Sequence, residues 1–101
     1  MITLQLSEKT EQRLKQVINL YKNEDKFFNK FIDFQINEIK LGLHNIKNDL
    51  AKFEKKYKMK TETFYNNFEN GKIGDEDDYM LWAGIYEMYL RDEKKLKQIQ
   101  W

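Results

Sequence analysis

The sequence predicts a mostly helical protein that begins with one short β-strand. Its first residues alternate between apolar and polar side chains, which is the period of a half-buried strand. Farther along, apolar residues recur on average every 3.5 positions through residues 32–57, as in a helix that packs along one seam. Aromatic residues make up 15% of the chain and proline is absent, so the chain has ample core-forming material and few helix breakers.

The strand is predicted over residues 2–6, where the three apolar side chains face one side and Thr3 and Gln5 face the other. Ser7 follows as a residue type that favours helix N-caps. A helix is therefore expected from Ser7 to about Tyr21. Its apolar face consists of Leu14, Val17, Ile18 and Tyr21.

A long second helix is predicted from Glu24 to Tyr57, with Asn23 as its cap. The apolar residues on its seam are separated alternately by four and three positions. They are Ile32, Ile36, Ile39, Leu43, Ile46, Leu50, Phe53 and Tyr57. The spacing fits either packing between two chains or packing within one, and both alternatives remain open.

Two further helices are expected in the C-terminal part. Thr61 is expected to cap a short helix that ends near Asn70, and Asp75 to cap a last helix with apolar residues through Leu90. We accordingly divide the chain into a module of residues 1–45, a helical extension of residues 46–60 and a C-terminal helical arm of residues 61–101.

The residue types argue against catalysis. The chain has no cysteine and a single histidine, His44, so it offers no thiolate chemistry and no pair of histidine ligands. Ser7, its only serine, lacks the context of a nucleophile, and no glycine-rich phosphate loop is present. The acidic run of residues 75–78 fits a helix N-terminus better than a cation site. We expect no enzymatic activity, no metal and no cofactor.

The net charge of +1 conceals an uneven distribution. Residues 1–60 carry 13 basic and 8 acidic side chains, a net of +5, whereas residues 61–101 carry 5 and 9, a net of −4. Opposite signs suggest two partners, nucleic acid for the basic part and a basic protein for the acidic part. No apolar run approaches the roughly 20 residues of a membrane span, and no signal peptide is evident, so we expect a cytoplasmic protein.

A lone strand leaves its backbone groups unpaired, so we expect it to pair with the same strand of a second chain. The resulting two-stranded antiparallel ribbon would form a homodimer, or part of a larger oligomer. Its outer face would display Thr3 and Gln5. Such a ribbon fits the major groove of DNA, where glutamine can bond to adenine and threonine can contact thymine.

These features resemble the ribbon-helix-helix (Arc/MetJ-like) transcription factors and antitoxins. The resemblance covers about half of the chain and rests on Ile2-Thr3-Leu4-Gln5-Leu6-Ser7, Leu14, Val17, Asn23 and Phe27-Phe28-xx-Phe31-Ile32. It implies a ribbon-helix-helix dimer that reads bases with Thr3 and Gln5 and anchors phosphate near Asn23. Lys9 and Lys26 would add favourable charge. Glu24 and Asp25 depart from the family pattern, and their charges oppose phosphate binding.

In the last helix, one apolar face (Tyr79, Trp82, Ala83, Tyr86 and Leu90) is expected to pack on the chain's own core, and the other (Leu81, Ile85 and Met88) to remain uncovered as a binding surface. The C-terminal part also resembles the toxin-binding segment of small prokaryotic antitoxins, through Phe53-Glu54-Lys55-Lys56-Tyr57-x-Met59, Phe64-xxx-Phe68-xx-Gly71-xx-Gly74-Asp75 and Asp78-xxx-Trp82. The residues expected to bind a toxin are Phe64, Phe68, Leu81, Trp82, Ile85 and Met88. The functional hypothesis is therefore an antitoxin of a type II toxin–antitoxin pair that neutralises a cognate toxin and represses its own operon by binding operator DNA. The alternatives are a stand-alone DNA-binding repressor and a helical dimeric scaffold without DNA binding.

Overall fold

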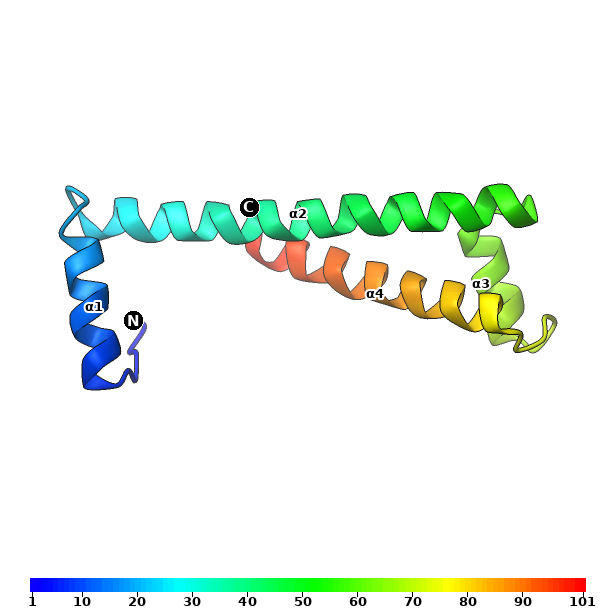
Figure 1. Cartoon of the computed structure of the whole chain (residues 1–101), viewed down its shortest axis with the longest axis horizontal. Helices are drawn as coiled ribbons and strands as arrows, with labels where there is room; N and C mark the ends of the chain where they lie inside the picture. The colour runs from blue at the N-terminus through cyan, green and yellow to red at the C-terminus, as the bar shows by residue number, and fades with distance from the viewer. The chain divides into compact units, whose positions relative to one another are not determined.

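The computed structural model describes residues 1–101 and consists of four α-helices without a β-strand (Figure 1). The helices are α1 (Glu8–Ile18), α2 (Glu24–Tyr57), α3 (Thr61–Glu69) and α4 (Asp77–Ile99). The chain divides into two compact units, residues 1–35 and residues 36–101, and α2 contributes to both. Residues 46–60 and 61–101, which we expected to be separate regions, belong to the same unit.

The predicted ribbon-helix-helix fold is wrong, because residues 2–6 form no strand. Outside the helices, no backbone hydrogen bond involves residues 1–6. The alternating pattern reports only which side chains share a face, whereas a strand also needs a second backbone segment to bond with. No other part of the chain is a strand, so the segment remains unpaired.

The first two helix starts agree with the sequence. The Ser7 hydroxyl accepts a hydrogen bond from the Thr10 backbone N–H at 3.2 Å, and Asn23 Oδ1 accepts one from the Lys26 N–H at 2.7 Å. These side chains satisfy amide groups that the first turn of a helix leaves free. The predicted bounds of α2 are confirmed, whereas α1 ends at Ile18, short of the expected Tyr21.

The caps of the last two helices differ from the prediction. Lys60 is the N-cap of α3, and Thr61 is the first residue inside the helix. Glu76, rather than Asp75, is the N-cap of α4. The predicted end of α3 is confirmed, because Asn70 is its C-cap and Gly71 follows with a φ of 71°, a left-handed conformation that glycine adopts without strain.

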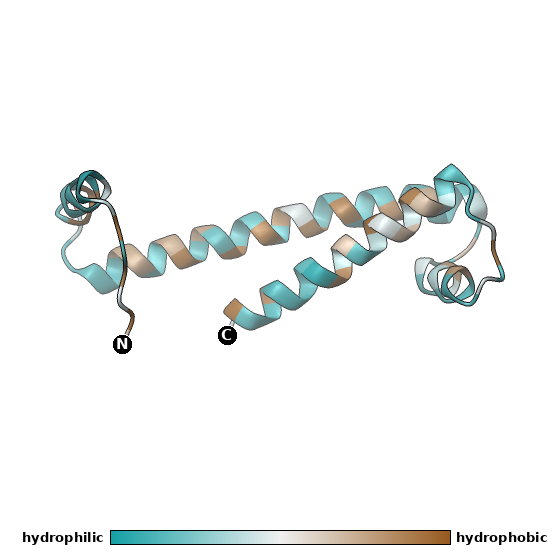
Figure 2. Ribbon diagram, turned by 90° about the horizontal axis from the view of Figure 1, so that it is seen from below, coloured by the Kyte–Doolittle hydropathy of each residue, from teal (hydrophilic) through white to brown (hydrophobic).

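Residues 36–101 form a helical unit with a core of their own. Figure 2 shows apolar residues recurring between hydrophilic ones along α2 and α4. The core joins α2, α3 and α4 through Ile46, Leu50, Phe64, Trp82 and Ala83. The rings of Phe64 and Trp82, both fully buried, stack with centroids 3.8 Å apart. Leu43, Ile46 and Leu50 of the α2 seam are thus buried within a single chain.

Residues 1–35 contrast with this unit, because none of them is buried. Leu14, Ile18, Tyr21, Phe27 and Phe28 are half-buried, and every other residue is exposed. Tyr21 and Phe27 meet edge to face at 5.3 Å, as do Phe27 and Phe28 at 4.9 Å. Apolar side chains are therefore present in this unit without a core that encloses them.

Candidate functional site

An apolar concavity lies within residues 1–35. It is an open groove of about 1230 Å³ between the N-terminal segment, α1 and the first turns of α2. We call it the N-terminal groove. Its apolar lining consists of Ile2, Leu4, Leu6, Leu14, Ile18, Phe27, Phe28, Phe31 and Ile32. Its polar lining residues are Gln5, Glu11, Lys15 and Glu24.

Several side chains of the N-terminal groove remain largely in water. Ile2 is 84% exposed, Leu4 is 57% exposed and Phe31 is 55% exposed. Contiguous apolar surface on a small protein marks an interaction site. The groove contains no catalytic constellation, because its ionisable side chains are two glutamates and a lysine at its rim. It is suited to binding an apolar surface.

The residues predicted to bind DNA all lie in this unit and are exposed. They are Thr3, Gln5, Lys9, Asn23 and Lys26. Apart from the Asn23–Lys26 cap, no hydrogen bond or ion pair joins them. The Asn23 amide oxygen is already engaged at the N-terminus of α2, with Glu24 and Asp25 in the first turn. Residues 1–35 carry six basic and five acidic side chains, so their net charge of +1 provides little attraction for phosphate.

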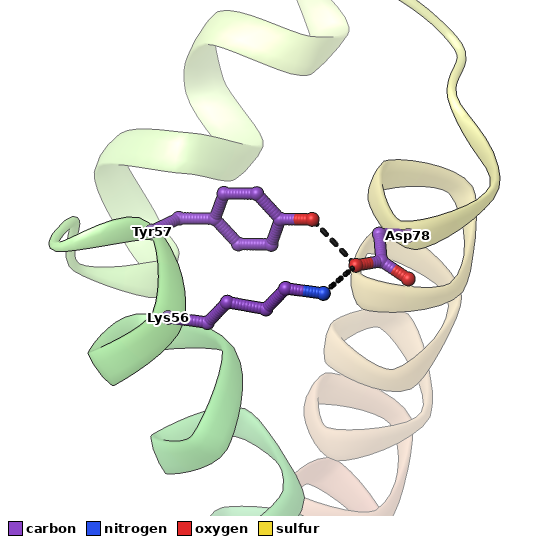
Figure 3. Close-up of polar contacts among 3 residues, drawn as sticks. All are labelled: Lys56, Tyr57 and Asp78. Carbon is purple, nitrogen blue, oxygen red and sulfur yellow. Dashed lines mark hydrogen bonds and ion pairs between the residues drawn. The ribbon is translucent and has the colours of Figure 1, made fainter.

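The basic excess of the first 60 residues resides in residues 36–60, which carry seven basic and three acidic side chains. The basic C-terminal end of α2 meets the acidic N-terminal end of α4. Lys56 Nζ lies 2.7 Å from Asp78 Oδ2, and the Tyr57 hydroxyl donates to the same oxygen (Figure 3). The hydrogen bonds from Lys56 and Tyr57 lower the pKa of Asp78, and Asp78 raises the pKa of Lys56 and of Tyr57.

Contacts within the chain account for part of the charge difference between residues 1–60 and residues 61–101. A helix C-terminus favours cations and a helix N-terminus favours anions. Lys55 and Lys56 occupy the last turn of α2, and Asp77 and Asp78 occupy the first turn of α4. The two ends meet through the Lys56–Asp78 ion pair. Opposite charge in the two parts of the sequence therefore does not require two external partners.

The residues predicted to bind a toxin fall into two groups. Phe64 and Trp82 are fully buried in the core, and Phe68 and Ile85 pack partly buried against it. Leu81 and Met88 are 56% and 43% exposed. Only the exposed pair is free to contact another protein in the folded chain. Of the α4 face that we expected the chain to leave uncovered, Leu81 and Met88 are exposed and Ile85 is partly buried.

A buried hydrogen-bond network, which we did not predict, ties α2, α3 and α4 together. The backbone N–H and the hydroxyl of Thr61 donate to Glu54 Oε2 at 2.8 and 2.9 Å. The Trp82 indole N–H donates to the Thr61 hydroxyl at 3.1 Å. A pocket of about 240 Å³ adjoins Glu54 and Thr61. Because every buried polar side-chain atom has a partner, we assign this network a structural role.

The structure contains no group of three histidine, aspartate or glutamate side chains placed to hold a metal ion. None of its helices is long and apolar enough to cross a membrane. Comparison of the chain with protein-family models, with curated proteins and with solved structures found no match. The N-terminal groove and the exposed face of α4 with Leu81 and Met88 are the two candidate binding surfaces of the chain.

Proposed function

We propose that the protein is a homodimeric binding protein assembled through the N-terminal groove. The observation that supports this proposal most is the contrast between its two units. Residues 36–101 enclose two fully buried aromatic rings, whereas residues 1–35 bury no side chain at all. So short a segment gains too little from burial to offset the entropy of ordering it. A second polypeptide in the groove would supply the missing core.

A second copy of residues 1–35 has enough apolar surface to be that polypeptide. Eight large apolar side chains after Met1 are exposed: Ile2, Leu4, Leu6, Val17, Leu20, Phe31, Ile32 and Phe34. Five of them, Ile2, Leu4, Leu6, Phe31 and Ile32, line the groove and offer about 500 Å² per copy at about 100 Å² each. Burying Val17, Leu20 and Phe34 as well would bring each side to the roughly 800 Å² of a typical stable interface. The unit's net charge of +1 adds little repulsion between two copies.

The test of this proposal is the mass of the full chain in solution. Sedimentation equilibrium across a hundredfold range of concentration is expected to show a reversible dimer. A monomer at every concentration would remove the homodimer. Repeating the measurement at high salt distinguishes an apolar interface from a charged one. The dimer persists if the interface is apolar and dissociates more readily if it is charged.

The narrower proposal within this class is an antitoxin. Its support is that Leu81 and Met88 are exposed on α4 within a segment of net charge −4, which suits a basic partner protein. Co-expression with the product of the neighbouring small gene tests it. A complex that Leu81→Asp and Met88→Asp weaken, while Thr63→Asp does not, would support the antitoxin. A complex that is absent or indifferent to these changes would end it.

Repression through DNA is the second candidate function, supported by the exposure of Thr3, Gln5 and Lys9. The test is binding of the full chain to its own promoter region at low salt. Loss of binding on replacing Thr3 and Gln5 by alanine would support sequence reading by these residues. Unchanged binding, or none in the parent protein, would leave the dimer without this role.

A further inference from the structure

The solvent-facing side of α4 carries a regular seam. Its members are separated by four, three, four, three and four positions: Asp77, Leu81, Gly84, Met88, Arg91 and Lys95. We call these six residues the outer seam. A helix repeats every 3.6 residues, so this spacing keeps them on one face, opposite the face that buries Trp82 and Ala83. None of the six is buried.

Gly84 forms a notch in the middle of the outer seam. A side-chain carbon added at this glycine would meet nothing within 4 Å, and the backbone there is helical. A glycine inside a helix destabilises it relative to alanine, and nothing within this chain requires one at this position. Between Leu81 and Met88, the missing side chain permits close approach of a second helix.

Charge divides the outer seam into opposite ends. Asp77 lies at its start and forms no salt bridge within the chain, while Arg91 and Lys95 lie at its other end. The two cations reach only Asp92, each at 4.0 Å and with side chains 62% and 58% exposed. Such loose exposed pairs contribute little, so both cations remain available to another anion.

We infer that α4 pairs with α4 of a second copy in antiparallel orientation along the outer seam. With the pair centred on residue 86, Gly84 lies opposite Met88 of the partner subunit. Asp77 then lies opposite Lys95 of the partner subunit. Each Met88 side chain then enters a glycine notch and each Asp77 faces a cation, while Leu81 lies opposite Arg91 of the partner subunit, whose aliphatic stem can cover it. The parallel alternative would place Asp77 against Asp77 of the partner subunit, which repels.

This contact is separate from the dimer proposed for the N-terminal groove, but it uses Leu81 and Met88 and therefore competes with a toxin for the same face of α4. Only two of the six residues, Leu81 and Met88, are large apolar side chains, so the outer seam offers less apolar surface than a stable specific interface buries. The contact is therefore weak by itself. At the concentrations where the N-terminal dimer forms, a contact this weak leaves the mass at that of a dimer, and only at much higher concentration would the two self-contacts together carry assembly beyond the dimer.

Disulfide trapping in the full chain tests the register, and the absence of native cysteine makes the background clean. Gly84→Cys and Met88→Cys are prepared as single variants and mixed under mild oxidation. Antiparallel pairing predicts that the mixed disulfide between positions 84 and 88 exceeds both homodisulfides at least fivefold. Lys94→Cys, on an exposed position off the seam, is the control. Dominant homodisulfides, or a mixed yield no higher than with Lys94→Cys, would overturn the proposal and leave the face to another partner.

A charge exchange gives an independent reading of orientation. Asp77→Lys or Lys95→Asp alone is expected to reduce the mixed disulfide at least threefold, and the two together to restore it. Lys94→Asp is expected to leave it unchanged. If the double variant gives as little mixed disulfide as the single variants, while circular dichroism shows unchanged helix content, antiparallel pairing is contradicted. The disulfide trapping is repeated in chains that also carry Phe31→Asp. Because only the N-terminal dimer uses Phe31, a mixed disulfide that persists in these chains belongs to the α4 contact.

Discussion

The Trp82 indole donates a buried hydrogen bond to the hydroxyl of Thr61, 21 residues earlier in the chain. That hydroxyl in turn donates to Glu54. Because Thr61 is 2% exposed and Trp82 is fully buried, removing the hydroxyl would leave the indole N–H without a partner. One hydroxyl thus connects the last helix of the chain to the second.

Replacing Thr61 by valine is expected to destabilise residues 36–101 by about 2 kcal/mol. Valine has nearly the same shape, so the loss comes from an unpaired indole N–H and a carboxylate with one donor fewer. Urea denaturation followed by tryptophan fluorescence measures it. Thr63→Val is the matched control, because Thr63 is exposed on the same helix. Equal stability of the two variants would show that the network contributes nothing.

Replacing Gly71 by alanine is expected to cost about 1 kcal/mol. Gly71 has a φ of 71°, where a side chain is strained, and it terminates α3. Gly74→Ala is the control, since Gly74 lacks that conformation and an added carbon there meets nothing within 4 Å. Thermal unfolding of both variants measures the difference. Similar losses in the two variants would argue against the left-handed end of α3.

Replacing Asp78 by asparagine is expected to remove part of the acid dependence of stability. The pKa of Asp78 is lowered in the folded chain by the hydrogen bonds from Lys56 and Tyr57. A lowered pKa means that the carboxylate stabilises the fold above its ordinary value near 4, and that this stabilisation is lost as the pH falls through the lowered pKa.

The measurement is the free energy of unfolding of the wild type and of Asp78→Asn at pH 7, 5 and 3. The difference between them is expected to be largest at pH 7 and pH 5 and to shrink by pH 3. Asp49→Asn is the control, because Asp49 is exposed and forms no ion pair. If wild type and Asp78→Asn differ by the same free energy of unfolding at all three pH values, the contact of Asp78 with Lys56 and Tyr57 is not the source of the acid dependence.

The helix positions were predictable where the signals are local. Ser7 and Asn23 cap the helices that directly follow them, and the spacing of apolar residues defines α2 over its whole length. Capping depends on groups within three or four residues, and helical periodicity depends on a single element. Such features need no knowledge of the rest of the fold.

The errors concern relationships between distant segments. Residues 2–6 have the pattern of a strand but no second strand to pair with. The hydroxyl of Thr61 serves Glu54 and Trp82 instead of capping α3, which no local pattern indicates. Trp82 has the features of a binding hot spot, yet its ring is stacked on Phe64 inside the chain.

The proposed assembly of residues 1–35 with a second copy through the N-terminal groove is tested most directly by two matched substitutions. Phe31→Asp places a charge in the groove, whereas Leu41→Asp places the same charge on α2 at a site of similar exposure, 58% against 55%. Sedimentation equilibrium at one concentration compares both variants with the wild type. A dimer is expected for the wild type and for Leu41→Asp, and a monomer for Phe31→Asp. A wild-type monomer, or a Phe31→Asp variant that remains dimeric, would contradict the proposed assembly.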